Sequence, residues 1–228
     1  DRIVLEADNT SADAQAEMQA AVVELGVFRD GRDLADAVEP ELFDRVETAA
    51  GRLGLPVSAL QPLEPWLVSV QLQAVNLQRG GWTAATPPAM VIIDTARRDG
   101  VQLDYLEGGT DVLTRMAALP DAVHVAMLEQ SVETLEIRPE EPAEILDAWL
   151  RGDTRQLAQI YHGPGAWADE RLRQAMLIDR NAAWSEAIDG MMSTHTGTVF
   201  VAVGAGHLVG ADSLVRDLRA RGHAVMRR

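Results

Sequence analysis

Short runs of apolar and β-branched residues alternate along this chain with longer stretches in which apolar positions recur at helical spacing. The short runs predict strands at 2–7 (RIVLEA), 101–109 (VQLDYLEGG) and 198–203 (TVFVAV). Because helical stretches separate the three strands, one sheet with helices packed on it is favoured. The sequence therefore predicts an α/β fold with a small, mainly parallel or mixed sheet and many flanking helices.

The stretches between the strands carry signals for helix starts and stops. In 39–54, Leu42 and Val46 lie at helical spacing and the segment ends at a glycine. Pro65 suits the first turn of a helix that Gly80 would end. On such signals we expect helices over 11–25, 39–54, 63–81, 86–100 and 211–222, and a short last strand over 223–228.

The stretch 110–192 is helical in pattern over most of its length. Its breaks lie near Pro120, Pro139, Pro142, Gly152 and 162–167. We interpret this block as a large helical insertion that covers one edge of the sheet. Since no internal repeat, low-complexity tract or long linker divides the chain, we expect a single domain over 1–228.

Composition excludes several classes of protein. Among 228 residues, 47% are hydrophobic and 24% charged, as in an ordinary globular protein. The net charge of −15 argues against nucleic-acid binding, which needs a basic face. Without cysteine there is no disulfide framework, thiolate metal site or cysteine nucleophile. No apolar run approaches the roughly 20 residues that span a bilayer, so no membrane-spanning segment is predicted.

The start of the chain raises a separate question. It opens directly on the strand-like DRIVLEAD, with no signal peptide. We therefore expect that an N-terminal segment has been removed or lies upstream of Asp1.

The glycine-rich turn GAGHLVG follows the last predicted strand. Gly204, Gly206 and Gly210 resemble a relaxed dinucleotide-binding fingerprint, in which a backbone approaches pyrophosphate at a helix N-terminus. That fold needs further strand–helix units downstream, and too little chain follows Gly210 to supply them. The nucleotide interpretation is therefore disfavoured.

A different pattern emerges where the strands end. Glu6, Glu107 and His207 each follow a predicted strand, and ligands of parallel α/β sheets bind beyond the carboxyl ends of the strands. Two carboxylates and an imidazole suit a divalent cation such as Mn²⁺, Fe²⁺, Co²⁺ or Zn²⁺. Such an ion acidifies a bound water and leaves a glutamate free as general base. The alternative, solvated glutamates and a loop histidine without chemistry, stays open at this point.

Arg180 and Asn181 lie in a predicted helix whose apolar positions, Trp184 among them, mark a buried face. An arginine beside that face could hold the anion of a substrate or pair with a carboxylate. An ion pair that merely ties the helix to the sheet is an equally open interpretation.

An ordered set of motifs along the whole chain resembles the TraB/GumN family, which includes the Tiki metalloproteases. The similar segments are IVLEAD, GRDLADAVEPELFDRV, LEPWLVSVQL, IDTARRDG, LDYLEGGTD, WLRGD, DRNAAW and FVAVGAGHLVG with the following SLVRDLRARGHAV. The family is described by two Gly-x-x-His motifs with glutamates and arginines at a shared site, and GAGH (204–207) matches the second. The first normally lies upstream of LEAD, so we expect a single TraB/GumN-like domain that lacks its N-terminal strand and first Gly-x-x-His motif.

The resemblance implies roles for individual residues. The implied catalytic residues are Glu6, Glu107, Arg180 and His207. The implied metal ligands are Glu6, Glu107 and His207, with Mn²⁺ or Co²⁺ as the expected ion and Zn²⁺ or Fe²⁺ as alternatives. The implied substrate-binding residues are Asn181, Gly204, Gly206 and Gly210.

The resemblance also implies a function. We expect a metal-dependent, peptidase-like hydrolase acting on a peptide or small-molecule ligand. The alternative is a non-catalytic protein that sequesters a peptide, a metal or a haem-like ligand in the same cleft. A periplasmic or extracytoplasmic location with the signal peptide removed is expected, and a cytoplasmic location remains open.

Overall fold

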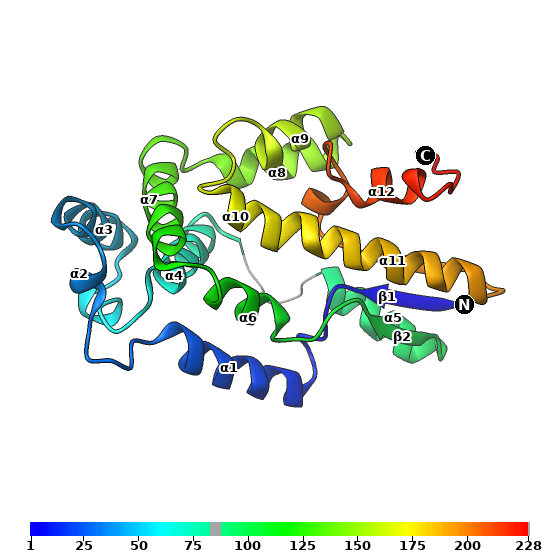
Figure 1. Ribbon diagram of the computed structural model, residues 1–228, viewed down its shortest axis with the longest axis horizontal. Helices are drawn as coiled ribbons and strands as arrows, with labels where there is room; N and C mark the ends of the chain where they lie inside the picture. The colour runs from blue at the N-terminus through cyan, green and yellow to red at the C-terminus, as the bar shows by residue number, and fades with distance from the viewer. Residues whose placement is uncertain (83–87, 228) are drawn as a thin grey trace.

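The computed structural model describes residues 1–82 and 88–227 and places a small parallel sheet among many helices (Figure 1). The strands are β1 (Arg2–Leu5), β2 (Gln102–Tyr105) and β3 (Val199–Ala202), in the order β2-β1-β3. Both pairings are parallel, as expected for strands joined through helices. The predicted α/β class is confirmed, and the described sheet is parallel throughout.

Twelve α-helices connect and cover the strands in the described part of the chain. Their bounds are α1 (Ala12–Gly26), α2 (Leu34–Ala37), α3 (Pro40–Leu53), α4 (Pro65–Arg79), α5 (Pro88–Asp99), α6 (Asp111–Ala117), α7 (Asp121–Ile137), α8 (Glu141–Leu150), α9 (Thr154–His162), α10 (Glu170–Arg173), α11 (Asp179–Thr194) and α12 (Leu214–Ala220). Three shorter turns are η1 (Val57–Ala59), the π-helical η2 (Gln174–Ile178) and η3 (Ala205–His207). None of these helices has the length and apolar character to cross a membrane.

The sequence signals explain where the helices begin and end. Pro40 opens α3 at its first position, and Gly54 closes it with a left-handed φ of 74°. The helix expected over 86–100 is α5, and the part of that prediction before Pro88 lies outside the described residues. The helix expected over 211–222 begins only at Leu214, after turn residues.

The described residues form four clusters of buried apolar side chains. One cluster joins α3, α4 and α7 through the fully buried Val46, Leu72 and Leu128. A second lies where α11 and α12 pack near β3, with Trp184 and Leu214 at its centre. In Figure 1, α11 runs alongside β1. One face of α11, which carries Trp184, packs against the sheet near β3. That packing positions the functional side chains described below.

The predicted last strand is wrong for the described residues 223–227, which form no strand. Gly222 adopts a left-handed φ of 94°, and the Arg219 guanidinium donates a hydrogen bond to the Val225 carbonyl. Arg227 then binds the carbonyl of Gly152 in the turn between α8 and α9. Because side chains hold the tail against the helices, it does not add to the sheet.

β1 is the central strand and is hydrogen-bonded on both sides. The position directly beside β1, where the expected N-terminal strand would pair, is therefore taken by β2 and β3. An additional strand could join this sheet only at the outer edge of β2 or β3.

Candidate functional site

The parallel register brings two glutamates together at the carboxyl end of the sheet. Leu5 is aligned with Tyr105, so β1 and β2 end level with each other. The Glu107 backbone N–H then donates to the Glu6 carbonyl at 2.9 Å, which continues the pairing past the strands. The two carboxylates consequently leave neighbouring chains at one edge.

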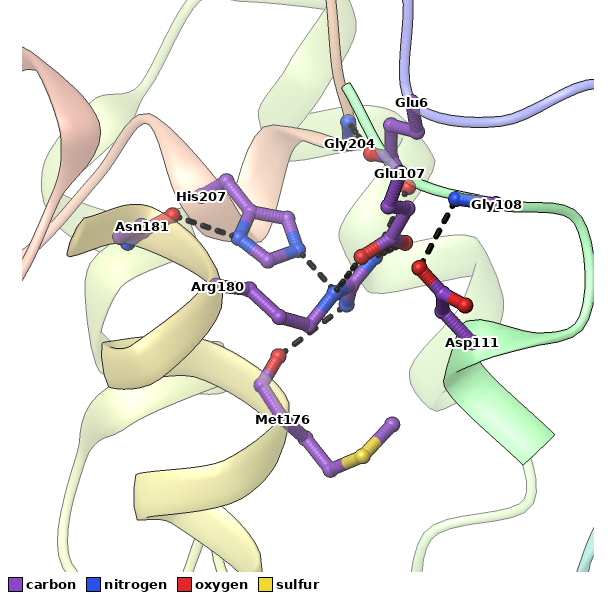
Figure 2. A network of polar contacts seen from close by, with 9 residues as sticks. All are labelled: Glu6, Glu107, Gly108, Asp111, Met176, Arg180, Asn181, Gly204 and His207. Carbon is purple, nitrogen blue, oxygen red and sulfur yellow. Dashed lines mark hydrogen bonds and ion pairs between the residues drawn. The ribbon is translucent and has the colours of Figure 1, made fainter. Parts of the chain in front are cut away.

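The Arg180 guanidinium lies between these carboxylates (Figure 2). Its Nη2 is 2.6 Å from Glu107 Oε1 and its Nε is 3.1 Å from Oε2, a two-pronged ion pair. The same Nη2 is 3.3 Å from Glu6 Oε2. The Arg180 and Glu107 side chains are only 8% and 5% exposed, whereas that of Glu6 is 33% exposed. Arg180 therefore forms the ion pair between helix and sheet that was one of its two possible roles in the sequence.

Two further contacts hold the Arg180 guanidinium, one from a backbone carbonyl and one from an aromatic ring. Its Nη1 donates to the Met176 carbonyl at 3.1 Å, in the π-helical turn η2 that precedes α11. Single π-turns in helices occur frequently at functional sites. The Trp184 ring lies one helical turn further on, with its centroid 4.6 Å from the guanidinium carbon. All three guanidinium nitrogens of Arg180 are therefore engaged, and the group lies over the Trp184 ring.

His207 completes the cluster from the turn after β3. Its Nδ1 is 2.8 Å from Asn181 Oδ1, and the Asn181 amide nitrogen donates to the Asp212 carbonyl at 2.6 Å. The second bond orients the amide, so Nδ1 must carry the proton that Oδ1 accepts. The lone pair of Nε2 then accepts from Arg180 Nη1 at 3.2 Å. Asn181 thus selects one neutral tautomer of His207.

Burial lowers the pKa of His207 from 6.5 to about 4, and the positive charge of Arg180 acts in the same direction. Glu6 opposes the shift, and His162 adds to it. The Trp184 ring, with its centroid 4.5 Å from that of the imidazole, supplies part of the apolar environment. At neutral pH the imidazole is uncharged and offers a lone pair.

The depressed pKa predicts how stability depends on pH. Unfolded His207 takes up its proton near pH 6.5 and folded His207 only near pH 4, so its contribution is complete above pH 6.5. It is lost as the pH falls from about 6.5 to about 4. Urea unfolding across this range should give a steeper loss of stability for the wild type than for His207→Gln. Equal slopes would contradict a buried, neutral His207.

The glycines of the turn make different contacts. The Gly204 N–H donates to Glu6 Oε1 and so belongs to the cluster. A Cβ on Gly206 would lie 3.5 Å from the Tyr161 ring, and His162 Nε2 donates to the Gly206 carbonyl at 2.8 Å. Gly210 has a φ of 84°, which favours glycine, and a Cβ there would lie 2.6 Å from His162. Gly206 and Gly210 therefore pack the turn against the end of α9.

The structure thus gathers most of the residues singled out in the sequence. Those that meet in one network are Glu6, Glu107, Arg180, Asn181, Gly204 and His207. Gly206 and Gly210 lie in the same turn without touching the guanidinium, and their substrate-binding role stays a prediction. Nothing in the sequence pattern assigned the Met176 carbonyl, Tyr161 or His162 to the site.

Trp184 was assigned only to a buried face, although its place four residues after Arg180 is the spacing of stacked helical neighbours. No sequence signal marks the π-turn that presents Met176.

The two carboxylates and the His207 lone pair all converge on one cation, the guanidinium. In the part of the chain that the structure describes, no three acidic or histidine side chains are gathered closely enough to hold a metal ion. The reason is visible in Figure 2, where Arg180 lies between the donors that such an ion would need. The arrangement already stabilises positive charge at this point.

The sequence was also compared with known proteins and protein families. The chain is 22% identical over 186 residues to the uncharacterized protein YbaP of Escherichia coli (strain K12). The aligned region covers 82% of this chain and 68% of YbaP. The YbaP protein of Shigella flexneri matches with the same identity and coverage. No solved structure matches. The family model described as TraB/PrgY/gumN matches residues 1–227, and the chain belongs to this family.

Proposed function

We propose that this chain is a metal-dependent hydrolase, peptidase-like in its substrates, with its active site at the Arg180 cluster. The observation that carries the proposal is the convergence of Glu6, Glu107 and the neutral His207 on a single cationic centre. A site of this kind needs a positive charge between its carboxylates. In the described structure the guanidinium supplies that charge.

The donor set fits a divalent metal ion in its chemistry. Carboxylate oxygens and a neutral imidazole nitrogen are ligands of Mn²⁺ and Co²⁺ and also of Zn²⁺ and Fe²⁺. Asn181 holds the Nδ1 proton of His207, and a second-shell hydrogen bond of this type prepares the other nitrogen for a metal. An ion bound by Glu6, Glu107 and His207 would supply an acidified water for hydrolysis.

Such an ion and the guanidinium compete for the same donors. Arg180 donates to both glutamates and to His207 Nε2, so it must release at least some of these bonds when a metal binds. Two adjacent cations also repel each other. Arg180 freed in this way becomes available to stabilise a developing oxyanion or a substrate carboxylate.

The two glutamates are suited to different roles. Glu107 is almost fully buried and bound through both oxygens, which suits a fixed ligand. Glu6 is more exposed, and its bond to Arg180 is the longest in the set at 3.3 Å. We assign Glu6 a metal contact through one carboxylate oxygen, and its other oxygen the task of orienting and deprotonating the attacking water.

The test is digestion of a mixed peptide library, read by mass spectrometry, with Mn²⁺ or Co²⁺ and with a chelator. We expect cleavage only with metal, and its loss in Glu6→Gln. Glu136→Gln is the matched control, because it removes a carboxylate that pairs with Arg45 on the surface. Binding of peptides without cleavage under all conditions would contradict the proposal and favour the sequestering protein.

A further inference from the structure

A large cleft lies among the helices beside α9. It has a volume of about 610 Å³ and is walled mainly by α7, α8, α9 and the loop 164–167. A second hollow of about 310 Å³ shares Gln73, Thr134 and Ile145 with it and continues along α4. We name the two together the α7–α9 cleft.

The walls of the α7–α9 cleft combine apolar side chains with uncharged hydrogen-bonding groups. The Gln73 amide nitrogen donates to Ser131 Oγ at 3.4 Å, and that of Gln130 donates to the Gly165 carbonyl at 2.6 Å. Each amide donates at least one N–H to the protein, and among the described residues neither amide oxygen accepts a hydrogen bond, so both oxygens can accept from a ligand. Repeated N–H donors beside apolar side chains are what an extended peptide provides.

The charge of the cleft is negative. Glu141 and Arg138 line it together and pair with each other at 2.9 Å. Glu133, an exposed residue of α7, lines it as well and forms no ion pair with any residue that the structure describes, although the charge of Arg45 reaches it. A carboxylate without an ion-pair partner at the edge of a partly enclosed cleft attracts a cationic group.

The cleft adjoins the turn that carries His207. Tyr161 lines the cleft and also packs its ring against Gly206, next to His207. His162, the following residue of α9, is bonded to the Gly206 carbonyl. A ligand lying along α9 therefore reaches Tyr161, the residue that joins the cleft to the η3 turn.

We infer that the α7–α9 cleft binds an extended peptide segment, selects a lysine or arginine side chain through Glu133, and leads the chain toward the Arg180 cluster. This inference rests on the proposed hydrolase function and adds a substrate class to it. The acidic wall makes peptides rich in glutamate poor ligands.

Binding alone, measured by fluorescence anisotropy with a chelator present, tests the inference without turnover. The probes are three labelled peptides of equal length that carry lysine, serine or glutamate at one central position. We expect the lysine peptide to bind best and Glu133→Gln to weaken it about fivefold, the effect of one partly screened charge pair. The serine peptide should bind Glu133→Gln and the wild type equally.

Glu129→Gln is the matched control, since Glu129 lies one turn earlier on α7, is 61% exposed and approaches Arg45 instead of the cleft. It should leave every affinity unchanged. Gln159→Trp, at an exposed position of the cleft wall, should weaken all three peptides. Equal affinity of the three peptides, or binding of a neutral oligosaccharide in their place, would overturn the inference. Selective binding without later cleavage would leave the inference standing and contradict only the hydrolase.

Discussion

Arg180→Met is expected to lower the free energy of unfolding by about 3–5 kcal/mol at neutral pH, the usual loss when one partner of a buried ion pair is removed. Glu107 is only 5% exposed, and the substitution leaves its carboxylate buried without the guanidinium. Methionine keeps most of the side-chain volume, so the loss reports mainly the unpaired charge. Urea unfolding measures it directly.

The same variant tests whether the Arg180 guanidinium and a divalent metal ion compete for the same ligands. If a divalent ion takes the place of the guanidinium, Mn²⁺ should bind Arg180→Met more tightly than the wild type and restore much of the lost stability. Glu107→Gln combined with Arg180→Met should regain stability without metal, because the buried charge is gone. Arg45→Met, which breaks the surface pair with Glu136 away from the cluster, is the control and should not respond to Mn²⁺. A wild type that binds Mn²⁺ better than Arg180→Met would contradict the competition.

His207→Ala is expected to weaken Mn²⁺ or Co²⁺ binding by at least about 100-fold and to abolish hydrolysis. The imidazole is the only nitrogen donor of the proposed set. The loss of stability should stay small beside that of Arg180→Met, because no charge is left unpaired. Calorimetric metal titration together with thermal melts distinguishes the two effects.

Asn181→Ala is expected to give a smaller loss of metal affinity than His207→Ala. It keeps the imidazole but removes the acceptor that holds its Nδ1 proton, so a loss of about 10–100-fold in metal affinity is expected. A histidine that only supports the turn would give the reverse pattern in His207→Ala, with lost stability and unchanged metal binding.

The meeting of Glu6, Glu107 and His207 could be predicted from the sequence because it follows from topology. Strands joined through helices run parallel, and their carboxyl ends share one edge of the sheet. Residues that follow each strand must then be neighbours, however far apart they lie in the chain. Arg180 and Asn181 were marked by their place beside the buried face of a helix, and the family resemblance assigned them to the same site.

The central position of Arg180 could not be predicted, because it depends on how α11 packs against the sheet. The π-turn before α11 and the stacking on Trp184 set the position of the guanidinium relative to the sheet, and neither has a local sequence signature.

The prediction of a last strand over 223–228 was wrong for a related reason. The apolar pattern of 223–228 is strand-like, but contacts of Arg219 and Arg227 hold the described tail against helices instead.

Anomalous diffraction from crystals soaked in Mn²⁺ tests whether the Arg180 cluster holds a metal ion. We predict an anomalous peak within about 2.3 Å of His207 Nε2 and of carboxylate oxygens from Glu6 and Glu107, with the Arg180 guanidinium displaced from Nε2. An undisturbed Arg180 at millimolar Mn²⁺, with no anomalous peak among these side chains, would contradict it.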